Sequence, residues 1–468
     1  GNVEEDSIES HVQNTMKSAY AIADEVAIRH LCENAPEAVN WLDSIGVCFS
    51  RTSDSKIAQR SLGGASAKRA CYAQDYTGLK ILHTLYDRCL SQGIRFINEH
   101  YLLDIIVDNG ITKGASFLNI RSGEVENFFA SSVILATGGY SRVYEKHSTN
   151  SSASAGDGLA CALRAGARVS DMEFVQFHPT GLKNSSILIS ESARGAGGYL
   201  LNSKGKRFVD ELLPRDKVAR AIDDEIKKGE DVFLDNRHLG ESFIDEELPQ
   251  ERKLAKLYEN VDPVDSLVPI KPVAHYTMGG IVVDDSSQTR VQGLFAAGEC
   301  ANHRVHGANR LGGNSLLELV VFGKQAGENA AKYALDVDTF ESIDHTVALH
   351  KNTNIEIDFY QVREELGDLF YKNVGIVRDE NSLKESLNVV DGYLKNIDKM
   401  GVQDSSKTYN TNFVEFLEFK NMLEISRLIL ISALSRQESR GAHFRSDFPQ
   451  IDEKFAMHTI IDKDGVVA

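Results

Sequence analysis

The stretch from Ala274 to Glu318 decides the fold: AHYTMGGIVVDDSSQTRVQGLFAAGECANHRVHGANRLGGNSLLE. Within it, residues 293–299 form a short apolar segment that ends in a glycine followed by Glu299. A glycine lets backbone approach a nucleotide closely, and a neighbouring carboxylate accepts hydrogen bonds from its hydroxyls. Residues 306–316 are a glycine-rich turn that opens a helix, whose amide end favours negative charge. The stretch therefore predicts one wall of a nucleotide-binding site.

A second glycine-bearing segment predicts another part of that site. Residues 132–139, SVILATGG, read as a buried strand that ends in paired glycines. Gly156, Asp157 and Gly158 then open a helix, with Asp157 at its N-terminus. A capping role for Asp157 is the simpler alternative, and it is compatible with a cofactor contact.

Size and composition exclude several classes of protein. A chain of 468 residues is too long for one compact core, so two or three domains are expected. The formal net charge of -17 argues against a nucleic-acid partner, so any anion site must be a local basic pocket. The six cysteines form no CxxC pair, which argues against a zinc or cluster motif. Without an apolar run of about 18 residues, the chain has no transmembrane segment of its own.

The first residues have helical spacing of apolar side chains. Residues 6–42 are expected to form amphipathic helices whose apolar stripes face a core. Pro36 stands where a new helix could begin, because proline is favoured in the first turn.

AHYTMGG, AAGE and HGANRLGGNSL, in this order, resemble the flavoprotein subunits of succinate dehydrogenase and fumarate reductase, and their relative L-aspartate oxidase. The resemblance implies an α/β, Rossmann-like FAD-binding domain with an inserted α+β capping domain and a C-terminal helical domain. The expected boundaries are 1–172 with 274–333 for the FAD-binding domain, 173–273 for the capping domain and 334–468 for the helical domain and tail.

By the same resemblance, FAD is the cofactor. Its expected contacts are Ala136, Thr137, Gly138, Gly139, Asp157, Glu299, Asn314, Ser315 and Leu316. The family opens with a G-x-G-x-x-G unit that binds the adenosine diphosphate part of FAD, and no such motif occurs here. We therefore expect an N-terminally truncated fragment that by itself holds FAD weakly.

Three further motifs carry the expected chemistry: DMEFVQFHPTG at 171–181, SESARGAGG at 190–198 and LPRDKVARAI at 213–222. The resemblance implies that Arg215 is the proton donor or acceptor, and that Glu191 and Arg194 relay protons to it. The residues expected to bind a C4 dicarboxylate are His178, Ser190, His275 and Arg310. Serine at 190 replaces the family's usual threonine and keeps the hydroxyl. An ordinary salt-bridge cluster is the alternative for Glu191 and the two arginines.

The implied reaction passes a hydride between flavin N5 and one substrate carbon, while Arg215 handles the proton on its neighbour. Arginine is almost never deprotonated, so this role requires excluded water and neighbouring cations, here Arg310 and any charged histidine. Clamping both carboxylates could twist one of them and make the central C=C more electrophilic. The clamp has no obvious partner for an ammonium group, because the only nearby carboxylate, Glu191, belongs to the relay.

The C-terminal part, mostly helical from Thr353, separates the related families. ESRGAHFRSD at 438–447 and the later His458-Thr459 resemble the respiratory dicarboxylate flavoproteins, whereas aspartate oxidases generally share only ESRG. This favours succinate and fumarate as substrates, with an iron-sulfur subunit and a quinone-linked membrane anchor as partners. The expected location is cytoplasmic, peripheral on the cytoplasmic membrane through those subunits. L-aspartate oxidase and a flavin-free, non-enzymatic scaffold are the alternatives.

Overall fold

The computed structural model describes residues 6–337, 343–349, 352, 355–463 and 465–466. Two compact units are each built from three separate segments of the chain. The first unit comprises residues 1–96, 176–275 and 305–321, and the second comprises residues 97–175, 276–304 and 322–468. Mixed α/β segments and a helical C-terminal region are both present, which confirms the predicted fold class. The predicted domain boundaries stay a prediction, and their ends at 1–5 and 467–468 lie outside the described residues.

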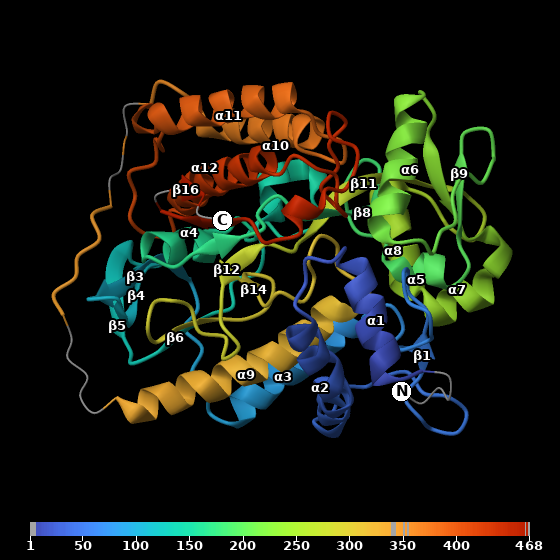
Figure 1. The fold of residues 1–468 in the computed structure, drawn as a ribbon, viewed down its shortest axis with the longest axis horizontal. Helices are drawn as coiled ribbons and strands as arrows, with labels where there is room; N and C mark the ends of the chain where they lie inside the picture. Colours follow the sequence, from blue (N-terminus) through green and yellow to red (C-terminus); the bar gives the residue numbers. More distant parts are fainter. Residues whose placement is uncertain (1–5, 338–342, 350–351, 353–354, 464, 467–468) are drawn as a thin grey trace. The chain divides into compact units, whose positions relative to one another are not determined.

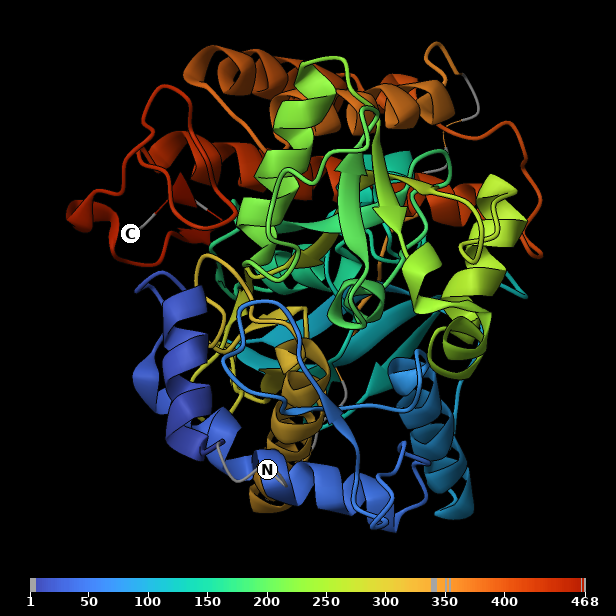
Figure 2. The same ribbon diagram turned by 90° about the vertical axis from the view of Figure 1, so that its right-hand side faces the viewer.

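A four-stranded sheet forms the core of the first unit. Its order is β8-β11-β10-β9, with bounds Val175–Leu182, Val268–Thr277, Val232–Asp235 and Tyr199–Asn202. Strand β10 runs antiparallel to both of its neighbours. Helix α6, Arg215–Lys227, runs along these strands (Figure 2) and buries Val218 and Ile222 among the sheet's apolar side chains. The core therefore fixes α6, whose first residue is Arg215.

Shorter helices continue this part of the first unit. They are α5 (Glu191–Gly195), η2 (Arg237–Leu239), α7 (Glu241–Glu247) and α8 (Pro249–Glu259). Helix α8 begins at Pro249, which has no N–H to leave unpaired. The carboxylate of Asp75 accepts hydrogen bonds from the next two amides, those of Gln250 and Glu251, at 2.8 and 3.0 Å. Asp75 thus caps α8 from a distant loop and fixes Glu251 in its first turn.

The N-terminal segment of the first unit is also largely helical. Its elements are α1 (Ile8–Ser18), α2 (Glu25–Ser44), β1 (Gln59–Arg60), β2 (Ala70–Cys71) and α3 (Thr77–Ser91). Ser7 and Asp24 cap α1 and α2 by accepting from Ser10 N and Val26 N. The expectation that a helix begins at Pro36 is wrong, because Pro36 lies inside α2.

The second unit contains three sheets. The parallel pair is β6 (Val133–Leu135) with β13 (Leu294–Ala296). A three-stranded sheet has the order β3-β4-β5, with bounds His100–Asp108, Ile111–Asn119 and Glu124–Phe129. A five-stranded sheet has the order β14-β12-β7-β15-β16, with bounds Ala301–Asn302, Gly280–Val282, Val169–Ser170, Ile460–Asp462 and Gly465–Val466.

Helices cover much of the second unit. They are η1 (Ser141–His147), α4 (Asp157–Arg164), α10 (Phe359–Asn373), α11 (Glu380–Lys395), η3 (Ile397–Lys399), α12 (Thr411–Ser435) and η4 (Glu453–Phe455). Helix α9, Asn314–Asp336, contributes residues to both units. Helices α10, α11 and α12 lie side by side (Figure 1), and buried Phe416 and Phe419 of α12 contact Phe359 of α10. No helix among the described residues combines the length and apolar composition needed to cross a membrane.

Candidate functional site

A buried ion pair joins two of the predicted catalytic residues in the first unit. Arg215 donates from Nε and Nη2 to Glu191 Oε2, at 2.9 and 2.5 Å. The third guanidinium nitrogen, Nη1, donates to Gln176 Oε1 at 3.1 Å. Arg310 donates from Nη2 to the same amide oxygen at 3.2 Å. Gln176 therefore holds the two guanidiniums beside each other without neutralising either.

The other oxygen of Glu191 faces different groups. Oε1 accepts from the backbone amide of Gly63 at 2.6 Å and lies 3.8 Å from Nη2 of Arg194. Burial alone would raise the pKa of Glu191, but the guanidiniums of Arg215 and Arg194 outweigh it and hold the pKa at about 2. Glu191 is thus an anion at neutral pH. Gly63 has no Cβ, and a Cβ there would overlap Oε1 of Glu191.

Arg194 lies one helical turn after Glu191 on α5, as the three-residue spacing predicted. Its Nη1 donates to the carbonyl of Glu211 at 2.5 Å. Burial lowers the pKa of Arg194 from its ordinary value, while the carboxylate of Glu191 opposes that change. The structure therefore brings Glu191, Arg194 and Arg215 together.

Two histidines are packed against each other in the same unit. The rings of His178 and His275 have centroids 4.9 Å apart and meet at 65°. Burial lowers the pKa of each histidine well below its usual value, and the charge of Arg215 lowers it further. His178 Nδ1 accepts from the amide of Thr180 at 3.2 Å, so its ring proton is on Nε2. Both histidines are therefore neutral at neutral pH and add no positive charge beside Arg215.

Ser190 contacts a carboxylate that the motifs did not predict. Its hydroxyl and its amide both donate to Oε1 of Glu251, the latter at 3.0 Å. Glu251 is buried, which raises its pKa to about 7, and the negative charge of Asp75 adds to this rise. The expectation that Glu191 is the only carboxylate near the clamp is therefore wrong. Glu251 occupies the third position of α8, where an acid ordinarily serves the helix terminus, so local sequence gave no signal.

In the second unit, the ends of β6 and β13 meet as the two glycine-bearing segments predicted. The strands are parallel, and the amide of Ala297 donates to the carbonyl of Leu135 at 3.0 Å just after them. A Cβ on Gly139 would overlap the carboxylate of Glu299 and the hydroxyl of Thr277. Glu299 Oε1 itself accepts from the amide of Thr277 at 2.9 Å. Gly139 thus lets the backbone come close to a ligand, and Glu299 offers a carboxylate fixed beside it, at the carboxyl ends of two parallel strands. Both features suit the hydroxyl-bearing part of a dinucleotide.

The other predicted cofactor residues of this unit lie nearby in sequence. Thr137 packs so closely on Gly158 that a Cβ at 158 would overlap its hydroxyl, and Gly138 has φ of 71°, which favours glycine. Asp157 begins α4 as predicted. Its Oδ1 accepts from Tyr101 and Asn421, at 2.6 Å in each case. Burial raises the pKa of Asp157, and its contact with a flavin stays a prediction.

Asn314, Ser315 and Leu316 open helix α9, as predicted. In the first unit, Asn314 Oδ1 lies 2.8 Å from Nε2 of His11, and its amide nitrogen donates to Thr15 at 3.0 Å. These contacts fix the first turn of α9 to α1. Their role as cofactor contacts remains a prediction.

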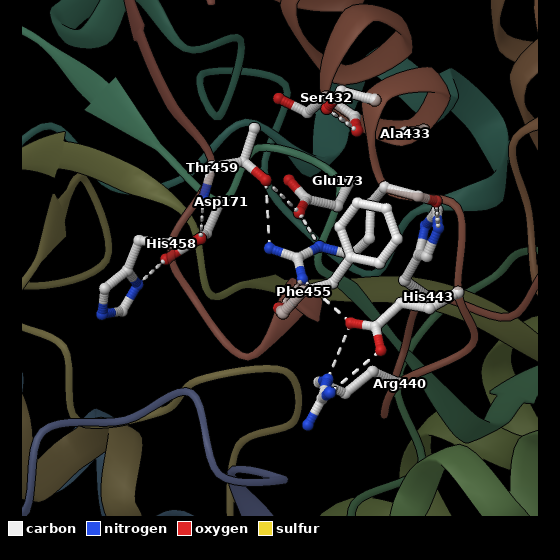
Figure 3. Close-up of polar contacts among 12 residues, drawn as sticks. Asp171, Glu173, Ser432, Ala433, Arg440, His443, Phe455, His458 and Thr459 are labelled. Atoms are coloured by element: carbon white, nitrogen blue, oxygen red, sulfur yellow. Dashed lines mark hydrogen bonds and ion pairs between the residues drawn. The ribbon is translucent and has the colours of Figure 1, made fainter. Parts of the chain in front are cut away.

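The C-terminal motif forms a buried network within the second unit (Figure 3). Arg436 donates to Glu173 at 2.5 Å and to Glu438 at 3.0 Å, and Arg440 donates to the same oxygen of Glu438 at 2.7 Å. His458 Nδ1 lies 2.6 Å from Oδ2 of Asp171. His458, Thr459 and the neighbouring Arg436 therefore tie the tail to the segment before β8.

Two family models match the chain. The FAD binding domain model matches residues 2–316, and the fumarate reductase flavoprotein C-terminal model matches residues 363–467.

Curated relatives match nearly the whole chain. The 8-methylmenaquinol:fumarate reductase flavoprotein subunit of Wolinella succinogenes is 40% identical, covering 99% of this chain and 80% of the relative. The succinate dehydrogenase flavoprotein subunit of Rickettsia conorii is 36% identical, covering 100% of this chain and 85% of the relative. A solved quinol-fumarate reductase with menaquinol molecules aligns with a TM-score of 0.93 and 34% identity, covering 99% of this chain and 87% of that chain.

Proposed function

The chain belongs to the family of succinate dehydrogenase and fumarate reductase flavoprotein subunits, and from this membership we propose that it interconverts succinate and fumarate. It is an oxidoreductase whose cofactor is FAD. When bound, the flavin takes up or supplies a hydride at N5. The observation that carries the substrate proposal is the pair of guanidiniums, Arg215 and Arg310, held on one neutral amide oxygen of Gln176.

The charge of the buried cluster supports a dianionic substrate. Arg194, Arg215 and Arg310 are cations, Glu191 is the anion among them, and His178 and His275 are neutral. Three buried guanidiniums among neutral donors and one carboxylate make this part of the unit electrostatically favourable for an anion. A C4 dicarboxylate supplies two negative charges. Arg310 is proposed to bind one carboxylate in bidentate fashion.

The uncharged donors complete the proposed clamp. His178, whose proton is on Nε2, is proposed to donate to a carboxylate without adding charge. His275 and Ser190 are proposed to do the same. Neutral donors give hydrogen bonds of fixed direction, so the clamp orients the substrate as well as attracting it.

Arg215 is proposed to transfer the proton, and Glu191 with Arg194 to return it. Glu191 accepts two hydrogen bonds from Arg215, so an acceptor for a guanidinium proton is already in place. Gln176 holds the third nitrogen of the same guanidinium, so the whole fork of Arg215 is fixed in place.

The expected partners remain proposals of the same kind. One relative is named for 8-methylmenaquinol and one solved structure holds menaquinol molecules, which supports a link to a quinol. We propose that electrons reach it through an iron-sulfur subunit and a membrane anchor. We place the chain at the cytoplasmic face of the membrane through these subunits. L-aspartate oxidase is the disfavoured alternative, because the C-terminal family model and the relatives are named for fumarate reductase and succinate dehydrogenase.

The test is turnover by the FAD-loaded protein. Succinate oxidation is followed with an artificial electron acceptor, and fumarate reduction with a reduced viologen. Saturable activity in at least one direction is expected, with inhibition by a non-reacting dicarboxylate such as malonate. Flavin-loaded protein that turns over neither succinate nor fumarate would contradict the proposal.

A further inference from the structure

The hydroxyl of Ser190 has one proton to donate and two lone pairs that can accept. The structure shows one donated and one accepted hydrogen bond. Its Oγ accepts from the amide of Ser192 at 3.3 Å, which caps α5. Its proton is directed to Oε1 of Glu251. While that bond lasts, Ser190 has no proton left for any other acceptor.

The surroundings of Glu251 differ at its two carboxyl oxygens. Its side chain is buried among apolar residues that include Leu248, Ala255 and Val268, and no described residue hydrogen-bonds to Oε2. The amide of Ser190 fixes Oε1 at 3.0 Å, and Asp75 fixes the amide of Glu251 itself. A carboxyl group held this firmly in apolar surroundings loses solvation when it ionises.

Two charged groups face this carboxyl from other elements. Asp75, in the loop before α3, disfavours the ionised form of Glu251, and Arg60 of β1 favours it. Burial is the largest effect, and the pKa of Glu251 is raised to about 7. The protonation of Glu251 would therefore change within the range in which respiratory enzymes work.

We propose that Glu251 is a positioning residue that controls whether Ser190 can donate its hydroxyl proton to a carboxylate of the substrate. The proposal rests on the proposed function, in which Ser190 helps to bind a dicarboxylate. When Glu251 is ionised, it accepts the only proton of Ser190, and the serine presents a lone pair elsewhere. When Glu251 is protonated, it donates to Oγ, and the serine proton turns toward the substrate.

The direction of the pH effect follows from this exchange. Below the pKa of Glu251, the clamp has one more donor for an anionic ligand. As pH rises through about 7, that donor is lost, and the KM for fumarate or succinate should rise. A hydrogen bond to a charged acceptor corresponds to a change of about tenfold or more in affinity. The kcat should change little by comparison, because Glu251 contacts neither the relay nor the proposed proton donor.

Glu251→Gln in the complete, FAD-loaded enzyme is the decisive variant. Glutamine does not titrate, and its carbonyl oxygen can accept from both the amide and the hydroxyl of Ser190, as Oε1 does now. The KM should therefore stay at its high-pH value and lose its dependence on pH. Ser190→Ala should raise the KM at low pH and also flatten its profile. Ser190→Thr keeps the hydroxyl and should retain the wild-type profile. Flavin content and circular dichroism identify any variant that has failed to fold.

Two outcomes would overturn the proposal. One is a wild-type KM that does not change with pH on either side of the Glu251 pKa, and the other is a rise of KM with pH that persists unchanged in Glu251→Gln. Malonate binding by calorimetry, at pH values on either side of the Glu251 pKa, provides a second measurement that needs no turnover. Malonate binding should weaken at the higher pH in the wild type and stay unchanged in Glu251→Gln. Absence of turnover in the wild type contradicts the proposed function, whereas equal pH effects on malonate binding to wild type and Glu251→Gln contradict this inference alone.

Discussion

Arg215 makes both of its hydrogen bonds to Glu191 through a single carboxylate oxygen, Oε2. The other oxygen is thereby left to the amide of Gly63 and to Arg194. One carboxylate thus links the proposed proton donor to the second arginine of the proposed relay.

Arg215→Lys should lower the turnover of succinate and fumarate by about 10²- to 10⁴-fold. A lysine lacks the guanidinium fork, so it cannot donate twice to Glu191 and also reach Gln176. Dicarboxylate binding, measured by calorimetry with malonate, should stay within about tenfold of wild type because Arg310 and the histidines remain.

Arg220→Lys is the matched control for that variant. Arg220 lies on the same helix and pairs with Asp216, away from Glu191. Its turnover should be close to that of wild type. A normal kcat in Arg215→Lys would contradict the proton-transfer role.

Gly63→Ala should disturb the anion that Arg215 depends on. The added Cβ would overlap Glu191 Oε1 and lie 3.1 Å from the carbonyl of Leu213. We expect a loss of about 1–3 kcal/mol in the free energy of unfolding, measured by denaturant titration, together with lower kcat. Gly78→Ala is the control, because a Cβ there meets only Leu316 at 3.8 Å. Equal stability of the two variants would contradict the close fit at Gly63.

Gly139→Ala should weaken FAD binding by about tenfold or more. Its Cβ would overlap Glu299 and Thr277, so the carboxylate must move from its held position. The flavin-to-protein absorbance ratio after dialysis measures the effect. Gly392→Ala in α11 is the control, since nothing lies within 4 Å of a Cβ there. Full flavin retention by Gly139→Ala would show that this contact does not shape the cofactor site.

The pair of His458 and Asp171 should make stability depend on pH. Burial lowers the pKa of His458, but the carboxylate of Asp171 outweighs it, and the net shift is upward. A histidine whose pKa is raised on folding stabilises fully below its unfolded pKa, and this stability is lost as pH rises through the folded pKa.

His458→Asn should therefore cost about 1 kcal/mol in unfolding free energy at mildly acidic pH and less at alkaline pH, since solvent screens the partly exposed ring. Chemical denaturation at both pH values measures the difference. Replacing the exposed His83 in the same way is the control. A cost that grows with pH would have the wrong sign for this ion pair.

The ordered motifs predicted the fold class and indicated which charged residues would gather, but not how they pair. Glu191 and Arg194 are three residues apart on one helix, which local spacing captures. Glu251 is 61 residues from Ser190 and meets it through the packing of α8, which no local pattern records. Gln176 lies inside the DMEFVQFHPTG motif and received no predicted role, although its amide oxygen holds two guanidiniums. Pro36 lies inside α2, so the preference of proline for the first turn of a helix did not locate a helix start there.

The FAD-loaded enzyme should prefer succinate or fumarate to L-aspartate, with a kcat/KM at least about tenfold higher. That ratio corresponds to roughly 1.4 kcal/mol in transition-state binding. The guanidiniums of Arg194, Arg215 and Arg310 are all buried and repel an ammonium group, and Glu191 is already paired with Arg215. Ionised Glu251 carries a negative charge, which would offset the repulsion of the ammonium group by the arginines.

The ratio of kcat/KM for succinate to that for L-aspartate should therefore be greatest below the pKa of Glu251 and smaller above it. Steady-state kcat/KM for both substrates at the two pH values provides the measurement, with Glu251→Gln expected to keep the preference constant. An equal or higher kcat/KM for L-aspartate at low pH would favour the oxidase alternative.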